Sequence, residues 1–135
     1  MPSPTANKRK GYRFEKEFVD YLVDEFPDID PDEIRRNGTL YGSNDRGDIQ
    51  LADLAFVFEL KNVQTFDLAG FCKELEREIA AHPEAQNGAV VIKARLRGIG
   101  DSYGVMPIRR LLALLRENRD LKRLLAAERE MRKHP

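Results

Sequence analysis

The sequence predicts a single α/β (α+β) domain in which a mixed β-sheet is flanked by helices. Short apolar stretches of strand length alternate along the chain with longer segments whose apolar residues recur at helical spacing. The chain has 135 residues, enough for one hydrophobic core but not for two. A hydrophobic content of 41% beside a charged content of 34% is typical of a globular protein with a highly charged surface.

The first half of the chain predicts one amphipathic helix followed by three strands. Phe14, Phe18 and Leu22 recur at helical spacing, and Pro27 ends that helix. The last two strands are separated only by a tight Ala-Asp-Leu connection. The expected elements are a flexible tail at residues 1–7, a helix at 8–26, strands at 34–37, 48–51 and 55–62, and a polar, glycine-containing loop at 38–47.

The second half predicts a helix, two strands and a long final helix. Asp67 is expected to cap the first of these helices, which His82 and Pro83 end. Leucines between positions 111 and 125 form an apolar stripe on the final helix, which belongs either to a dimer interface or over the sheet of its own chain. The expected inner face of the first helix contains Leu68, Phe71, Cys72, Leu75 and Ile79. The remaining expectations are strands at 89–93 and 103–106, a helix at 107–131, a main domain at 8–115 and a C-terminal helical extension at 116–135.

Composition excludes several classes of protein. No apolar run approaches the roughly 20 residues needed to span a bilayer, and the first residues lack the apolar core of a signal peptide. A single cysteine, Cys72, excludes an intrachain disulfide and fits a reducing compartment, so we expect a cytoplasmic protein.

The net charge of the chain is zero, but its charges are unevenly distributed. A basic N-terminal segment precedes an acidic segment at residues 17–34, and such separated patches allow one face of the protein to bind phosphates.

Polar residues at the ends of the two central strands predict an active site. Glu59 and Lys61 are two residues apart on a strand, so their side chains leave the same face, while Leu60 points into the core. Asp48 begins the preceding strand. Carboxylates are hard ligands suited to Mg²⁺ or Mn²⁺, and a lysine beside them can stabilise charge developing on a phosphate. This combination predicts metal-dependent phosphodiester hydrolysis.

These residues and their surroundings resemble the PD-(D/E)XK nuclease superfamily, and within it the archaeal-type and phage-type Holliday-junction resolvases. The resemblance rests on four segments over roughly residues 8–115: KGYRFE at 10–15, two consecutive arginines at 35–36, NDRGDI at 44–49 and FELKN at 58–62. It implies a restriction-endonuclease-like α-β-β-β-α-β core and makes residues 8–115 a nuclease domain. Gly47 stands where the superfamily name has proline.

The resemblance also implies roles for individual residues. Asp48 and Glu59 match the metal-binding carboxylates, with the backbone carbonyl of Leu60 as a further ligand. Lys61 matches the active-site lysine, and Glu15 falls where resolvases have a first-helix acid that completes the metal site. The expected products are a 5′-phosphate and a 3′-hydroxyl.

Each site residue also has a simpler interpretation. Glu59 and Lys61 form a same-face salt bridge in that case, and Asp48 only ends a glycine-rich turn. Glu15 is then an ordinary solvent-facing acid of a helix.

Basic residues near these carboxylates are candidate contacts to DNA phosphates. The expected DNA-binding residues are Lys8, Arg9, Lys10, Arg13, Arg35, Arg36, Ser43 and Arg46. Because two symmetric cuts resolve a four-way junction, the resemblance implies a homodimer acting on branched DNA in recombination and repair. Three alternatives stay open: another nuclease of this fold, including nicking, restriction-like, repair and RecB-like enzymes; an inactive DNA-binding module; and a structural protein built around its last helix.

Overall fold

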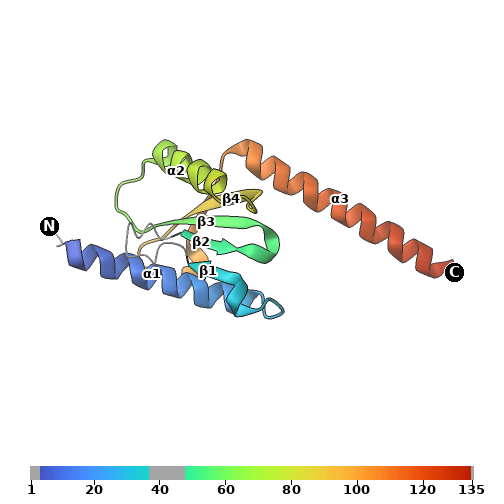
Figure 1. Ribbon diagram of the computed structural model, residues 1–135, viewed down its shortest axis with the longest axis horizontal. Coiled ribbons are helices and arrows are strands. Elements are labelled where there is room, and N and C mark those ends of the chain that lie inside the picture. The colour runs from blue at the N-terminus through green and yellow to red at the C-terminus, as the bar shows by residue number, and fades with distance from the viewer. Residues whose placement is uncertain (1–3, 37–47, 135) are drawn as a thin grey trace.

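The computed structural model describes residues 4–36 and 48–134, and the chain has an α+β fold with the predicted order of helices and strands (Figure 1). Helix α1 covers one face of a five-stranded mixed sheet and α2 covers the other, while α3 projects away from the sheet. The elements are α1 (Pro4–Glu25), β1 (Ile34–Arg36), β2 (Asp48–Leu51), β3 (Phe56–Lys61), α2 (Leu68–Ala81), β4 (Asn87–Ile92), β5 (Tyr103–Val105) and α3 (Ile108–Lys133), with single 3-10 turns at Pro31–Glu33, Ala52–Leu54 and Ile99–Asp101.

The strands lie in chain order across the sheet, from β1 to β5. β3 and β4 are parallel because α2 carries the chain back across the sheet between them, and the other neighbouring pairs are antiparallel. The tight connection between β2 and β3 is the turn Ala52–Leu54, after which Ala55 adopts a left-handed conformation with φ of 52°. This turn fixes a register in which Asp48 is paired with Glu59.

Alternate side chains of β3 divide the core into two layers. Leu60 faces α1, whereas Val57 faces α2, as the two-residue period of a strand requires. The α1 layer contains Phe14, Phe18, Leu22, Ile34, Ile49, Leu51, Leu60 and Val91. The α2 layer contains Val57, Phe71, Leu75, Ile79, Val90 and Ile92.

Three details differ from the sequence predictions. Helix α1 begins at Pro4 rather than at residue 8, because proline is well suited to the first turn, where its missing N–H has no helical partner. Leu68 is exposed instead of lying on the inner face of α2, since it occupies the first helical position after the cap Asp67. Helix α3 is continuous across residue 116, where the sequence placed the start of an extension.

Helix α3 is attached to the body by its first turn. The guanidinium groups of Arg109 and Arg110 form ion pairs with Glu76 of α2, and the amide of Asn87 donates a hydrogen bond of 3.1 Å to the carbonyl of Arg110. Every residue from 111 to 133 is exposed, so the leucine stripe does not cover the sheet of its own chain. Among the described residues, neither α3 nor any other helix is long and apolar enough to cross a membrane.

Substitution of Gly88 by alanine tests the packing of α2 on the sheet, because there is no room for a methyl group at this position. A Cβ atom at Gly88 would lie 2.5 Å from the carbonyl oxygen of Val57 and 3.0 Å from Leu75, whereas one at Gly104 of β5 meets nothing within 4 Å. We expect Gly88→Ala to destabilise the fold by roughly 1–3 kcal/mol and Gly104→Ala to change it by less than about 0.5 kcal/mol. Urea unfolding measures both, and equal effects would contradict this packing.

Candidate active site

Glu59 is a completely buried carboxylate near the end of β3. Its side chain is 1% exposed, and its Cα is paired with that of Asp48 at the start of β2. The side chain of Asp48 lies outside the described residues, so its part in the site rests on this backbone register. A carboxylate removed from water is costly unless cations or hydrogen-bond donors compensate it. The fold therefore keeps a carboxylate whose burial costs free energy near the end of β3, where the sequence predicted an active-site residue.

Lys61 joins Glu59 on the same face of β3, as predicted. The Nζ atom of Lys61 lies 3.5 Å from Oε1 of Glu59 and forms a second ion pair with Glu74 of α2. It also lies 5.2 Å from the centre of the Phe71 ring, within the range of a cation–π contact. Two carboxylates from different elements thus hold one partly buried ammonium group.

Glu74 is a member of this cluster that the sequence analysis missed. Its acidic side chain is 39% exposed, and it comes from α2 rather than from a strand. Helix α2 contains three glutamates, and nothing in their spacing indicates which of them faces the end of β3. Only the packing of α2 across the sheet identifies it.

Leu60 and Glu15 take positions that bear on their predicted roles. The Leu60 side chain packs in the α1 layer, opposite to Glu59 and Lys61, as expected from strand alternation. Glu15 on α1 is only 1% exposed, which excludes its interpretation as a solvent-facing acid. Within the described residues, no three His, Cys, Asp or Glu side chains form a group that could hold a metal ion. The predicted metal site therefore depends on Asp48, and the roles of Glu15 and of the Leu60 carbonyl stay predictions.

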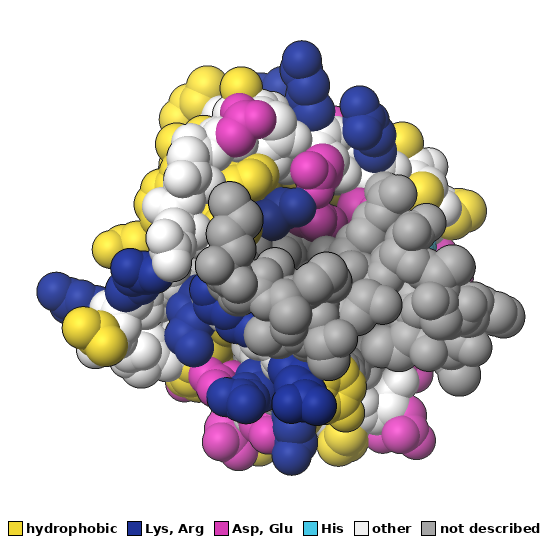
Figure 2. All heavy atoms as spheres, turned by 90° about the vertical axis from the view of Figure 1, so that its left-hand side faces the viewer, with side chains coloured by type: hydrophobic (Ala, Val, Ile, Leu, Met, Phe, Trp, Pro, Cys, Tyr) yellow, Lys and Arg dark blue, Asp and Glu magenta, His cyan; other side chains and the backbone are white. Residues whose placement is uncertain are grey.

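The predicted DNA contacts are described in part. Arg9, Lys10 and Arg13 are exposed on α1. The side chains of Lys8, Arg35 and Arg36 lie outside the described residues, as do Ser43 and Arg46 entirely. Figure 2 views the end of the molecule where α1 begins and β3 ends, and it shows several Lys and Arg side chains there with Asp and Glu side chains among them. Cations thus gather at the end of the molecule where β3 ends.

Lys93 is a further cation at the same edge of the sheet. It follows β4, and its backbone N–H donates a hydrogen bond of 3.0 Å to the carbonyl of Lys61. Its Nζ atom lies 6.0 Å from the centre of the Phe14 ring, on the side of the sheet covered by α1. The sequence placed Lys93 at the end of a core strand but did not connect it with Lys61. Parallel pairing of β3 with β4 makes that connection.

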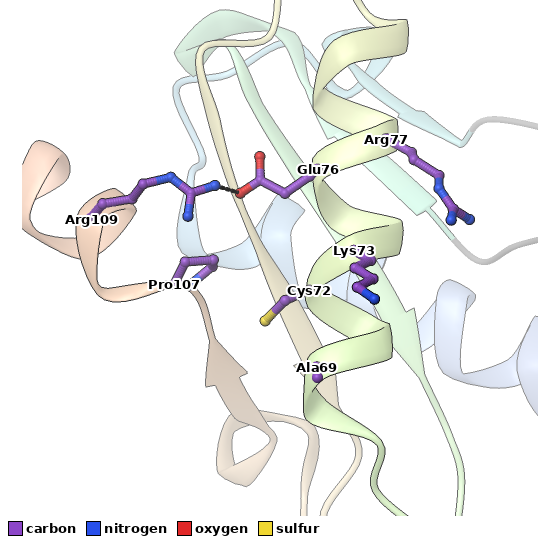
Figure 3. A pocket seen from close by; sticks show the side chains of 7 residues that line it. All are labelled: Ala69, Cys72, Lys73, Glu76, Arg77, Pro107 and Arg109. Atoms are coloured by element: carbon purple, nitrogen blue, oxygen red, sulfur yellow. Dashed lines mark hydrogen bonds and ion pairs between the residues drawn. The ribbon is translucent and has the colours of Figure 1, made fainter.

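An open hollow of about 330 Å³ lies elsewhere, between α2 and the start of α3 (Figure 3). It contains none of the predicted site residues; its lining is Ala69, Cys72, Lys73, Glu76, Arg77, Pro107 and Arg109. Hydrogen bonds from Arg110 lower the pKa of Glu76 below its usual value of 4.5, partial burial opposes this shift, and the charge of Arg109 adds to it. We interpret this cluster as the attachment of α3.

Comparison of the chain with protein-family models, with curated proteins and with solved structures gave no match in any of the three.

The Glu76 cluster predicts a pH-dependent contribution to stability. Because the folded-state pKa of Glu76 is lowered, its stabilising effect is present above the unfolded pKa near 4.5 and is lost as the pH falls through the folded value. We expect Glu76→Gln to lower stability by roughly 1 kcal/mol at neutral pH and to match the unsubstituted chain at strongly acidic pH.

Thermal unfolding across this pH range measures the effect of the Glu76 substitution. Glu128→Gln is the control, since Glu128 forms an exposed pair with Arg132 on α3 at 2.8 Å, and it should change little at any pH. If the loss of stability in Glu76→Gln stayed constant with pH, the ionised carboxylate of Glu76 would contribute nothing to stability.

Proposed function

We propose that this protein is a metal-dependent DNA endonuclease with a PD-(D/E)XK-type core, and that it resolves four-way DNA junctions by paired symmetric nicks. The observation that carries this proposal is the register of β2 and β3, which sets Asp48 opposite the buried Glu59, two residues before Lys61. An acid pair at the ends of adjacent strands with a lysine beside it is the arrangement that hydrolysis of a phosphodiester needs. The α+β fold and its order of elements are compatible with such a core.

The donor set fits a hard divalent cation. We propose that the carboxylates of Glu59 and Asp48 hold Mg²⁺ or Mn²⁺, with the Leu60 carbonyl and Glu15 as further ligands. The burial of Glu59 supports this role, because a buried acid gains most from a directly bound cation. When bound, the metal would polarise a phosphoryl oxygen and make a coordinated water acidic enough to act as the nucleophile.

Lys61 has the position and chemistry to bind the phosphate under attack. Its ammonium group is compact, with three rotatable donors, and it can turn from Glu59 and Glu74 toward a phosphate oxygen without moving β3. Phe71 contacts it and limits its other orientations. We assign Glu74 a positioning role, in which its ion pair with Lys61 holds the lysine side chain near the site before DNA binds.

Basic residues around this edge would supply the sequence-independent part of DNA binding. The exposed Arg9, Lys10 and Arg13 of α1 are suited to phosphates flanking the cut, and we propose the same for Lys8, Arg35, Arg36 and Arg46. Two copies of the chain would supply the two active sites that symmetric cleavage of a junction requires.

Cleavage of a labelled four-way junction beside a linear duplex of the same sequence tests this proposal. We expect paired nicks in the junction with Mg²⁺ or Mn²⁺ and none with EDTA. Glu59→Gln should reduce the rate by roughly a thousandfold, because the buried acid at the reacting centre is lost. Glu74→Gln is the matched control: it removes the other carboxylate that contacts Lys61 and should cost about tenfold or less.

The possible outcomes separate the competing functions. Equal cutting of junction and duplex would keep the nuclease and reject junction specificity. Progressive degradation from DNA ends would indicate a RecB-like exonuclease. Binding of DNA without cleavage under any metal would contradict the enzyme and favour an inactive binding module.

A further inference from the structure

Helix α3 exposes many large apolar side chains to solvent. It is about 39 Å long, and within its own chain it is held by the contacts of its first turn to Glu76 and Asn87. The large apolar side chains exposed along it are Ile108, Leu111, Leu112, Leu114, Leu115, Leu121, Leu124, Leu125 and Met131. Most helical stability in proteins comes from packing of an apolar face, and contiguous exposed apolar surface of this kind marks an interaction site.

The leucines follow the seven-residue repeat of a coiled coil. Leu111, Asn118 and Leu125 are spaced by seven residues, and so are Leu114 and Leu121. With the first set at a positions and the second at d positions, these five residues form a narrow stripe, which we call the seam. Leu115 and Leu124 flank the seam at e and g positions, while Leu112 lies outside it at a b position.

We propose that the seam of α3 pairs with the seam of a second copy of this chain to form a parallel, two-stranded coiled coil. In this arrangement each seam residue packs on the same residue of the partner copy, as a twofold axis along the helices requires. The proposal assigns an interface to the two copies that the proposed function requires. Its test measures mass and not activity, so the failure of one is distinguishable from the failure of the other.

The polar residues in and beside the seam select the parallel orientation. A single asparagine at an a position fixes register in two-stranded coiled coils, and Asn118 faces its own counterpart only when the helices are parallel. In the same register, Glu117 at a g position lies beside Lys122 of the partner copy at an e position, so opposite charges meet. In the antiparallel alignment, Asn118 faces a leucine and the two copies of Lys122 face each other.

The placement of the remaining charges favours a protein partner over DNA on the seam. Helix α3 has nine Arg or Lys residues against four Asp or Glu, and Arg109, Arg116 and Arg123 fall at f positions on the side opposite to the seam. The seam itself offers leucine side chains, which do not bind phosphate. Figure 1 shows α3 extending away from the end of the sheet where β3 meets the loop to α2, so pairing through α3 leaves the candidate active site uncovered.

Sedimentation equilibrium of the full chain tests the proposal. We expect a dimer, and we expect Leu121→Glu to weaken its association by roughly a hundredfold, because two acidic groups replace two packed leucines. Leu112→Glu is the matched control: it introduces the same charge on the same helix at a similarly exposed leucine, 50% against 56%, but outside the seam. It should leave the dimer intact, and circular dichroism checks that both variants keep their fold.

Disulfide trapping tests the orientation. In a Cys72→Ser background, Leu125→Cys should form an intermolecular disulfide on oxidation, because position 125 faces itself in the parallel pair; in the antiparallel pair the two cysteines lie roughly 17 Å apart. Leu112→Cys in the same background should not.

Three results would overturn the proposal. The first is a full chain that stays monomeric at tens of micromolar, whether or not α3 then binds duplex DNA or anionic vesicles. The second is equal dissociation by Leu121→Glu and Leu112→Glu. The third is a dimer in which Leu125→Cys does not cross-link.

Discussion

The buried carboxylate of Glu59 is the constraint to which the surrounding structure has to conform. Glu59 lies inside the protein between a strand that begins with Asp48 and a lysine two residues further along its own strand. A fold optimised for stability alone would place an apolar residue there, because a buried ion pair seldom repays its loss of hydration. The sheet register sets Asp48 opposite this group and the lysine pairs with it, which is why we propose the function here.

The molecule separates its two unusual features. The carboxylate–lysine cluster lies where β3 ends, and the exposed leucines lie on α3, which extends from the other end of the sheet (Figure 1). The two apolar layers between them provide the rigidity that the proposed catalytic role of this cluster would need. Helix α3 contributes little to those layers, so its sequence is free to serve association.

Local patterns predicted most of the fold, because each signal lies within a few residues. The alternation along β3 placed Glu59 and Lys61 on one face and Leu60 on the other, and Asp67 caps α2 by accepting a hydrogen bond of 3.0 Å from the Gly70 N–H. What the sequence missed depends on contacts between distant elements: Glu74 reaches Lys61 across 13 residues, and Arg110 reaches Glu76 across 34. The burial of Glu15 and the exposure of the α3 leucines likewise depend on how helices pack, which helical spacing alone does not specify.

Binding of Mn²⁺ tests the central claim most directly, because it asks whether the buried acid is a metal ligand without requiring the right DNA. Titration of the intact chain, followed by the loss of the electron paramagnetic resonance signal of free Mn²⁺, should show a site that Glu59→Gln abolishes and Glu74→Gln retains. Equal binding by both variants, or no binding by the intact chain, would contradict the account and leave Glu59 and Lys61 as a structural ion pair.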